Sequence, residues 1–208
     1  MTAPQRSTSL ALSAGWIAFV ACVFAVTAGV LQVSRADLDP IAMPLSAYLR
    51  GAGGAWLRGA YYLMASALAC LAWSSFRVTR ADLRSGLASI LLLVAALALP
   101  VVAATVLYEH TSAEALAQLL HSEAAQATFL CLVIAMLVLS IRWQRDPRMQ
   151  RGRHLGVALA WLAFVQMWVL ALWQGLPQGL TQKALIVLIL LWLGWVARQL
   201  WRVSLSHD

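Results

Sequence analysis

Six apolar stretches, none of which contains Asp, Glu, Lys, Arg or His, divide the sequence and limit what it can fold into. They are Leu10–Val33, Gly59–Phe76, Gly86–Tyr108, Ala124–Ile141, Leu155–Trp173 and Ala184–Ala197. A helix needs about 20 apolar residues to cross a bilayer core, and the shorter stretches gain length from flanking Trp and Arg side chains that reach the interface. We therefore expect an all-α membrane bundle of six transmembrane helices, forming a single domain over residues 1–208.

The composition agrees with a membrane protein. Apolar residues make up 62% of the chain and charged residues 11%. In soluble domains the apolar fraction is about 45–50% and the charged fraction about 25%. At this length a soluble fold cannot bury so much apolar surface, so the excess must face lipid. The net charge of +7 would suggest a nucleic-acid partner in a soluble protein. Here the cations lie mostly in short loops, so we expect the lipid bilayer as partner and no nucleic acid.

Cationic residues are distributed unequally between the two sets of loops, and this inequality predicts the orientation. One set, together with both termini, contains eleven: Arg6, Arg77, Arg80, Arg84, Arg142, Arg145, Arg148, Arg151, Arg153, Arg198 and Arg202. The other set contains four, which are Arg35, Arg50, Arg58 and Lys183. Because cytoplasmic loops are enriched in Lys and Arg, we expect both termini in the cytoplasm and a multi-pass protein of the cell inner membrane.

Two connections on the predicted outer side are longer than simple turns. In residues 35–58, two prolines disfavour a continuous helix and a group of glycines permits a tight bend. In residues 109–123, Thr111 and Glu114 fit a capping box, and three leucines follow at helical spacing. We therefore expect a short amphipathic helix in this outer loop between helices 3 and 4, lying on the leaflet.

Acidic and histidine side chains gather on the predicted outer side, where they form the candidate site. Its members are Asp39, Ser46, Glu109 and His121, with His110 and Glu123 on the same side. A histidine with two carboxylates (His121, Asp39 and Glu109) can bind zinc, and a histidine with one carboxylate can act as general acid and base. Ser46 with His121 and Asp39 can also form a nucleophilic triad.

None of these hypotheses has a diagnostic spacing, so simpler interpretations stay open. The sequence contains no His-Glu-x-x-His, no Gly-x-Ser-x-Gly and no phosphate-binding loop. Asp39 before Pro40 also fits a turn, Ser46 fits a helix cap, and Glu109 fits an ordinary solvated carboxylate. The residues alone leave the cofactor open between none and zinc.

The connection between the fourth and fifth stretches, residues 142–153, contains the most arginines of any loop. Near an anionic membrane surface each cation adds about 1 kcal/mol of attraction, so this loop is a candidate contact for anionic phospholipid headgroups. The alternative is that its charges only fix the topology.

Several short motifs resemble those of a bacterial membrane family, the domain of unknown function 998. They are Asp39-Pro40 followed by Pro44-Leu45-Ser46, and Leu120-His121 followed by Ala125 and Phe129 at the start of the fourth helix. The resemblance covers most of the chain and implies six helices. It matches Ser46 and His121 to a serine and a histidine that recur in the family, and Glu109 to an acid that closes the third helix. It implies no established activity, although the layout is similar to membrane proteins that handle lipids.

Three classes of function remain. The first is a structural or accessory protein of the cell envelope, with partners that the sequence does not name. The second is a membrane-embedded hydrolase or transferase that acts on lipid at the outer leaflet through His121, Ser46, Asp39 and Glu109. The third is a small transporter, which we rank last because no ionisable side chain lies in the middle of a predicted span.

The predicted orientation can be tested with topology reporters. A reporter fused after Gln150 is expected to lie in the cytoplasm, and one fused after Ser112 outside, because Gln150 lies within the arginine-rich loop. Enzymatic reporters that work on only one side of the membrane measure this. The opposite pair of results would contradict the orientation.

Overall fold

The computed structural model describes residues 3–173 and 175–205 of the chain. These residues form six long α-helices and four short 3-10 helices, with no strand among them, which confirms the all-α prediction. The long helices are α1 (Ala3–Ser34), α2 (Gly54–Val78), α3 (Gly86–Thr105), α4 (Glu114–Gln144), α5 (Arg153–Leu172) and α6 (Gln178–Leu205). The short ones are η1 (Leu45–Leu49), η2 (Ala81–Leu83), η3 (Val106–Tyr108) and η4 (Pro147–Met149).

Each predicted stretch falls on one long helix. Two stretches, those on α3 and α5, run past the end of their helix, by a few residues at most. Five of the helices, α1, α3, α4, α5 and α6, are long and apolar enough to cross a membrane. Helix α2 is not among them, and its apolar stretch contains Tyr61, Tyr62 and several serines. The chain is therefore a multi-pass helical protein whose environment is the lipid bilayer.

The long helices form a closed ring. Each packs mainly against its neighbours in sequence, and α6 packs against α1. All six contribute to one buried apolar core. On α1 the core-facing side includes Ala14, Ala21 and Ala28, whose small side chains let the neighbouring helices approach closely in lipid.

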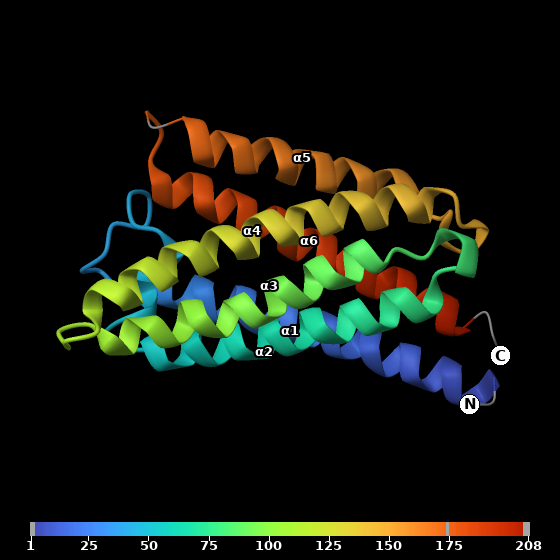
Figure 1. Ribbon diagram of the computed structural model, residues 1–208, viewed down its shortest axis with the longest axis horizontal. Helices are drawn as coiled ribbons and strands as arrows, with labels where there is room; N and C mark the ends of the chain where they lie inside the picture. The colour runs from blue at the N-terminus through green and yellow to red at the C-terminus, as the bar shows by residue number, and fades with distance from the viewer. Residues whose placement is uncertain (1–2, 174, 206–208) are drawn as a thin grey trace.

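Helix α1 begins and α6 ends at the same end of the bundle (Figure 1). This end also contains the connections 79–85 and 145–152, and we call it the arginine end. The opposite end, on the left of Figure 1, contains the connections 35–53 and 106–113 and the described residues between α5 and α6, which are 173 and 175–177. We call it the histidine end. Helices α4 and α5 lie close together near the arginine end and diverge toward the histidine end (Figure 1).

The segment between α3 and α4 differs from the sequence prediction. Residues 114–123 form the first turns of α4, which runs without interruption to Gln144, rather than a separate short helix. No Pro or Gly breaks the hydrogen-bond ladder after Glu114, so the helix simply continues. The Glu114 carboxylate accepts a hydrogen bond from the backbone N–H of His110 at 2.9 Å and so holds the incoming turn against the helix start.

A buried carboxylate organises the arginine end. Asp146 is fully buried, and its carboxylate accepts hydrogen bonds from the backbone N–H and the guanidinium of Arg148, at 3.1–3.2 Å, and from the backbone N–H of Arg80 at 3.4 Å. Next to it, the Trp143 indole donates to the Thr79 hydroxyl at 2.8 Å. Burial opposes ionisation of Asp146, but the Arg148 and Arg80 donors outweigh it and hold the pKa of the carboxyl below its usual value.

Asp146→Asn is expected to lower the thermal unfolding temperature at pH 7, because the buried oxygens lose a charge that stabilises their hydrogen bonds, a loss of about 1–3 kcal/mol. The pKa of Asp146 is lower in the folded protein than in the unfolded chain, so the ionised carboxylate stabilises the fold at every pH above the unfolded pKa. This contribution disappears as the pH falls through the folded pKa. The difference in unfolding temperature between wild type and Asp146→Asn should therefore stay constant from neutral pH down to about 5 and become smaller below about pH 4. A gap that widens on acidification would contradict this assignment.

Candidate functional site

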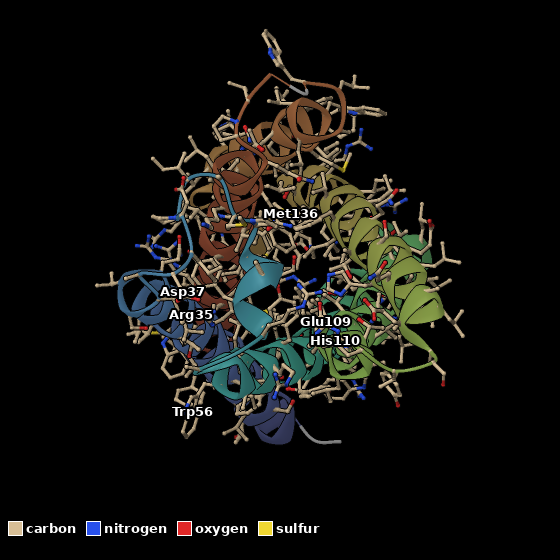
Figure 2. All side chains as sticks on the ribbon, turned by 90° about the vertical axis from the view of Figure 1, so that its left-hand side faces the viewer. Arg35, Asp37, Trp56, Glu109, His110 and Met136 are labelled. Atoms are coloured by element: carbon tan, nitrogen blue, oxygen red, sulfur yellow. The ribbon has the colours of Figure 1, made fainter. Side chains whose placement is uncertain are left out.

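Residues 35–53 cross the histidine end of the bundle without forming an α-helix. In Figure 2, which looks onto this end, Arg35 and Asp37 lie to one side of the light-blue turn η1, and Glu109 and His110 lie to the other. Leu45, Tyr48 and Leu49 of η1 are buried, so the turn closes the centre of the ring. The segment thus positions side chains from distant parts of the chain around one point.

Cationic and amide side chains fasten this segment to the helices. Arg35 donates to the carbonyl groups of Arg50 (2.6 Å) and Ala52 (3.3 Å). Arg58 on α2 donates to the Leu49 carbonyl at 2.6 Å. From α6, the Lys183 ammonium donates to the Pro40 carbonyl, and the Gln182 side chain accepts from the backbone N–H of Leu45 at 2.8 Å. These bonds satisfy backbone groups that would otherwise have no partner in a dry environment.

Two glycines allow the segment to lie directly on helix ends. A Cβ atom on Gly54, the first residue of α2, would be 2.3 Å from the Leu49 carbonyl oxygen. A Cβ atom on Gly179 of α6 would be 2.3 Å from the Met43 carbonyl oxygen. Only a residue without a side chain fits at these two contacts.

An ion pair joins the segment to the end of α3. Arg50 Nε donates to Glu109 Oε2 at 2.7 Å, and both side chains are partly exposed, at 42% and 33%. An exposed pair of this kind contributes at most about 1 kcal/mol to stability. Its structural effect is to hold the Arg50 guanidinium beside the start of α4.

His121 is held in one ring orientation by α3. Its Nδ1 lies 3.1 Å from the Val102 carbonyl oxygen and 3.0 Å from the Thr105 hydroxyl oxygen. A carbonyl oxygen can only accept, so we place the proton of the neutral ring on Nδ1. The other ring nitrogen, Nε2, then carries a lone pair that can accept a hydrogen bond or a proton.

Arg50, Glu109 and His121 line one polar pocket at the histidine end. Its volume is about 90 Å³, and Thr105, Val106, Glu114, Ala117 and Gln118 complete its wall. The pocket therefore combines a guanidinium, two carboxylates and an imidazole. Such a set can bind a small polar or anionic group and can exchange a proton with it.

An apolar cavity of about 70 Å³ lies next to this pocket, inside the ring. It is lined from α1, α2, α3, α4, α6 and η1 by Phe24, Ser46, Tyr61, Met64, Leu99, Val102, Ala125, Thr128, Phe129, Leu132, Gln182, Ile186, Ile189 and Leu190. Three of these residues, Phe129 on α4 and Ile186 and Leu190 on α6, are only half-buried. Val102 links the two regions, since it lines the cavity and its carbonyl oxygen holds His121 of the polar pocket.

The structure brings together some of the sequence-predicted residues and separates others. Glu109 and His121 line the same polar pocket, and Ser46 lines the adjacent cavity. Asp39 lines neither, because its carboxylate accepts from the backbone N–H groups of Ile41 (2.7 Å) and Ala42 (3.3 Å) in its own turn. His110 also contributes to a turn, in a left-handed backbone conformation with φ of 61°.

The hypothetical zinc set does not assemble. Within residues 3–173 and 175–205, no three His, Cys, Asp or Glu side chains lie close enough together to hold a metal ion. His121 and Glu109 share a pocket, but Asp39 is committed to its turn and Arg50 occupies the Glu109 carboxylate. The donor set therefore fits a hydrogen-bonded ligand better than a divalent cation.

Sequence reasoning missed three members of this region. On the sequence alone, Arg50 is only a signal of orientation, Gln182 has no assigned role, and Thr105 lies inside an apolar stretch. Their partners, Glu109, Leu45 and His121, are 59, 137 and 16 residues away in the chain. The one available signal was that Arg50 is a cation at the predicted outer side, where cations are rare.

The fold and this site define a polytopic helical membrane protein with a polar pocket above an apolar cavity. The model of the family described as "Protein of unknown function (DUF998)" matches residues 16–199, and the chain belongs to this family. The resemblance seen in the sequence is thereby confirmed. Comparison with curated proteins gave no match, and neither did comparison with solved structures.

Gly54→Ala is expected to destabilise the protein by about 1–3 kcal/mol, because a carbonyl oxygen 2.3 Å from the new methyl group cannot move without displacing η1. The matched control is Gly59→Ala on the same helix, where nothing lies within 4 Å of the added atom. That control should be neutral or stabilising, since Ala favours helix by up to about 1 kcal/mol. Thermal unfolding in detergent measures both, and equal unfolding temperatures would refute the close contact.

Proposed function

We propose that this protein is an accessory protein of the cell inner membrane that holds a lipid of the outer leaflet. One acyl chain enters the apolar cavity, and the polar headgroup lies in the pocket of Arg50, Glu109 and His121. The observation that carries the proposal is the closeness of the two regions: Val102 lines the apolar cavity, and its carbonyl oxygen bonds His121, which lines the polar pocket. An amphiphile is the class of ligand that needs both environments side by side.

The cavity suits a hydrocarbon chain rather than a polar molecule. Polar side chains are few among its lining residues, and two of them are already engaged: Thr128 donates to the Ala124 carbonyl at 2.8 Å, and Gln182 accepts from Leu45. A site needs room for about one probe sphere, 10–15 Å³, to hold a water, and apolar cavities larger than this stay dry and accept apolar ligands. We expect a chain to enter from the bilayer beside the half-buried residues Phe129, Ile186 and Leu190.

The pocket suits a headgroup with both an anionic part and a hydrogen-bond donor. Arg50 uses Nε for Glu109, and its two terminal nitrogens can bind an anion bidentately. The lone pair that we assign to His121 Nε2 can accept from a hydroxyl or ammonium group. Phosphodiester headgroups that carry such a donor therefore fit better than headgroups without one.

The membrane arrangement that this function requires includes α2 as a sixth span of one domain. At 25 residues α2 is about 37 Å long, more than the roughly 30 Å of a bilayer core. It packs between α1 and α3 in the ring. The cations gather at the arginine end, which supports a cytoplasmic location for that end and an outer location for the histidine end. Binding of anionic lipid by residues 142–153 stays a prediction. Two of the arginines of this loop, Arg142 and Arg148, already form hydrogen bonds within the protein.

A second candidate is a lipid hydrolase or transferase at the same place. The orientation of His121 favours it, because a lone pair on Nε2 facing a bound headgroup can act as a general base. Ser46 lines the adjoining cavity and would be the nucleophile. Asp39 has no part in this version, since its own turn occupies it.

The test is photocrosslinking in nanodiscs with a phosphatidylglycerol that carries a diazirine in its acyl chain. Wild type is expected to be labelled on α4 and α6. Ala125→Phe, which fills the cavity, should reduce this labelling about tenfold, the change that corresponds to 1.4 kcal/mol. Ala184→Phe adds the same ring to an exposed position of α6 and should leave labelling unchanged.

Equal labelling of all three proteins would refute the cavity as the binding site. Mass spectrometry of the lipid recovered after incubation separates the two candidates. Intact phosphatidylglycerol supports the accessory protein, whereas a cleaved or transferred product that His121→Asn no longer forms supports the enzyme.

A further inference from the structure

Four side chains that can form hydrogen bonds line the apolar cavity, and three of them have a group without a partner. The four are Ser46, Tyr61, Thr128 and Gln182. In the part of the chain that the structure describes, the hydroxyls of Ser46 and Tyr61 and the amide nitrogen of Gln182 have no hydrogen-bond partner. From this set we infer that the lipid of the proposed function is an ester-linked glycerolipid, whose acyl ester carbonyl accepts hydrogen bonds from these groups.

The amide of Gln182 is oriented by η1. The backbone N–H of Leu45 can only donate, so the side-chain atom 2.8 Å from it is the amide oxygen, and the NH₂ group is left as a donor. Leu45 precedes Ser46 in η1. The Gln182 amide and Ser46 therefore lie near each other, at the end of the cavity that η1 closes.

Tyr61 contributes a third donor from α2. It follows Gly54, the first residue of α2, by two helical turns, so its backbone is about 10 Å deeper in the bundle. A long helical side chain leans toward the N-terminus of its helix, and α2 begins at the histidine end, so the Tyr61 ring leans toward η1. Tyr61 is only 7% exposed, and its ring packs on Phe24 with 5.3 Å between the ring centres. A buried hydroxyl without a partner is unfavourable, and an acceptor on the ligand removes that cost.

An ester carbonyl is the acceptor that suits this position. A simple alkyl or polyprenyl chain carries no acceptor, and a fatty acid would bring a charged carboxylate into a cavity whose described lining contains no cation. The 3-10 turn rises about 2 Å per residue, so Ser46 and Arg50 are about 8 Å apart along η1. This is comparable with the span from the phosphate to the acyl ester in a glycerophospholipid, so a headgroup at Arg50 places an ester at Ser46.

Native mass spectrometry of the whole protein tests the inference with two phosphatidylglycerols of equal chain length, one with ester-linked and one with ether-linked chains. Wild type is expected to bind the ester lipid about tenfold more tightly, because an ether has no carbonyl to accept the hydrogen bonds. The double variant S46A/Y61F removes both hydroxyls and should reduce this preference to about twofold. Its affinity for the ether lipid should be unchanged, which shows that the cavity is intact.

The matched control is the double variant Y62F/T128V, which also removes two hydroxyls. Tyr62 is 44% exposed and does not line the cavity, whereas Thr128 lines it but already donates to the Ala124 carbonyl. This control should keep the preference for the ester lipid. Equal losses of preference in S46A/Y61F and Y62F/T128V would overturn the inference.

Failure of this inference can be separated from failure of the proposed function. Equal binding of the two lipids by wild type, with both weakened by Ala125→Phe, would overturn the ester contact and leave the lipid site in place. Binding that Ala125→Phe does not change would overturn the lipid site and the ester contact together. The same spectra give the mass of the bound lipid. Loss of an acyl chain in wild type but not in Ser46→Ala would assign Ser46 to cleavage and overturn its role in binding.

Discussion

A chain segment that crosses the end of a membrane bundle without forming a helix must find hydrogen-bond donors for its carbonyl groups. At the histidine end, cationic side chains supply many of these donors. Arg35, Arg58 and Lys183 each donate to a carbonyl of residues 40–52. The fourth cation of this end, Arg50, binds Glu109. Cations are scarce at this end, and each has a defined structural partner.

The two regions of the candidate site follow from that arrangement. Because η1 closes the centre of the ring, the space beneath it is sheltered and remains apolar. Because the segment then turns at residue 50 toward the end of α3, it carries a guanidinium to the place where α3 and α4 present Thr105 and His121. The position of Arg50 in the polar pocket therefore depends on the bonds that hold residues 35–53. Substitutions that remove these bonds are expected to change the geometry of the pocket.

The sequence predicts the helices well and the site only in part. Runs without ionisable residues are a local signal, and each of them lies on one helix. The separate outer helix was wrong because a leucine stripe looks the same on a short helix and on the first turns of a long one. Within the site, Glu109 and His121 share a pocket, as the sequence predicts. Asp39 lies apart, because its carboxylate accepts hydrogen bonds from the nearby backbone N–H groups of Ile41 and Ala42. The sequence around Asp39 permits both this local turn and a distant partner, so it does not decide between them. Pairings such as Leu45 with Gln182 leave no mark on a single sequence.

The closure of the ring between α1 and α6 has a consequence for biosynthesis. Ribosomes add about 5–20 residues per second, so roughly 7 to 29 seconds separate the end of α1 at Ser34 from the start of α6 at Gln178. During that interval one face of α1 has no helix to pack on, and the Pro40 carbonyl and the Leu45 amide wait for Lys183 and Gln182. A chain that stalls before its last helix would expose these groups together, which is the kind of defect that membrane chaperones and quality-control proteases can recognise.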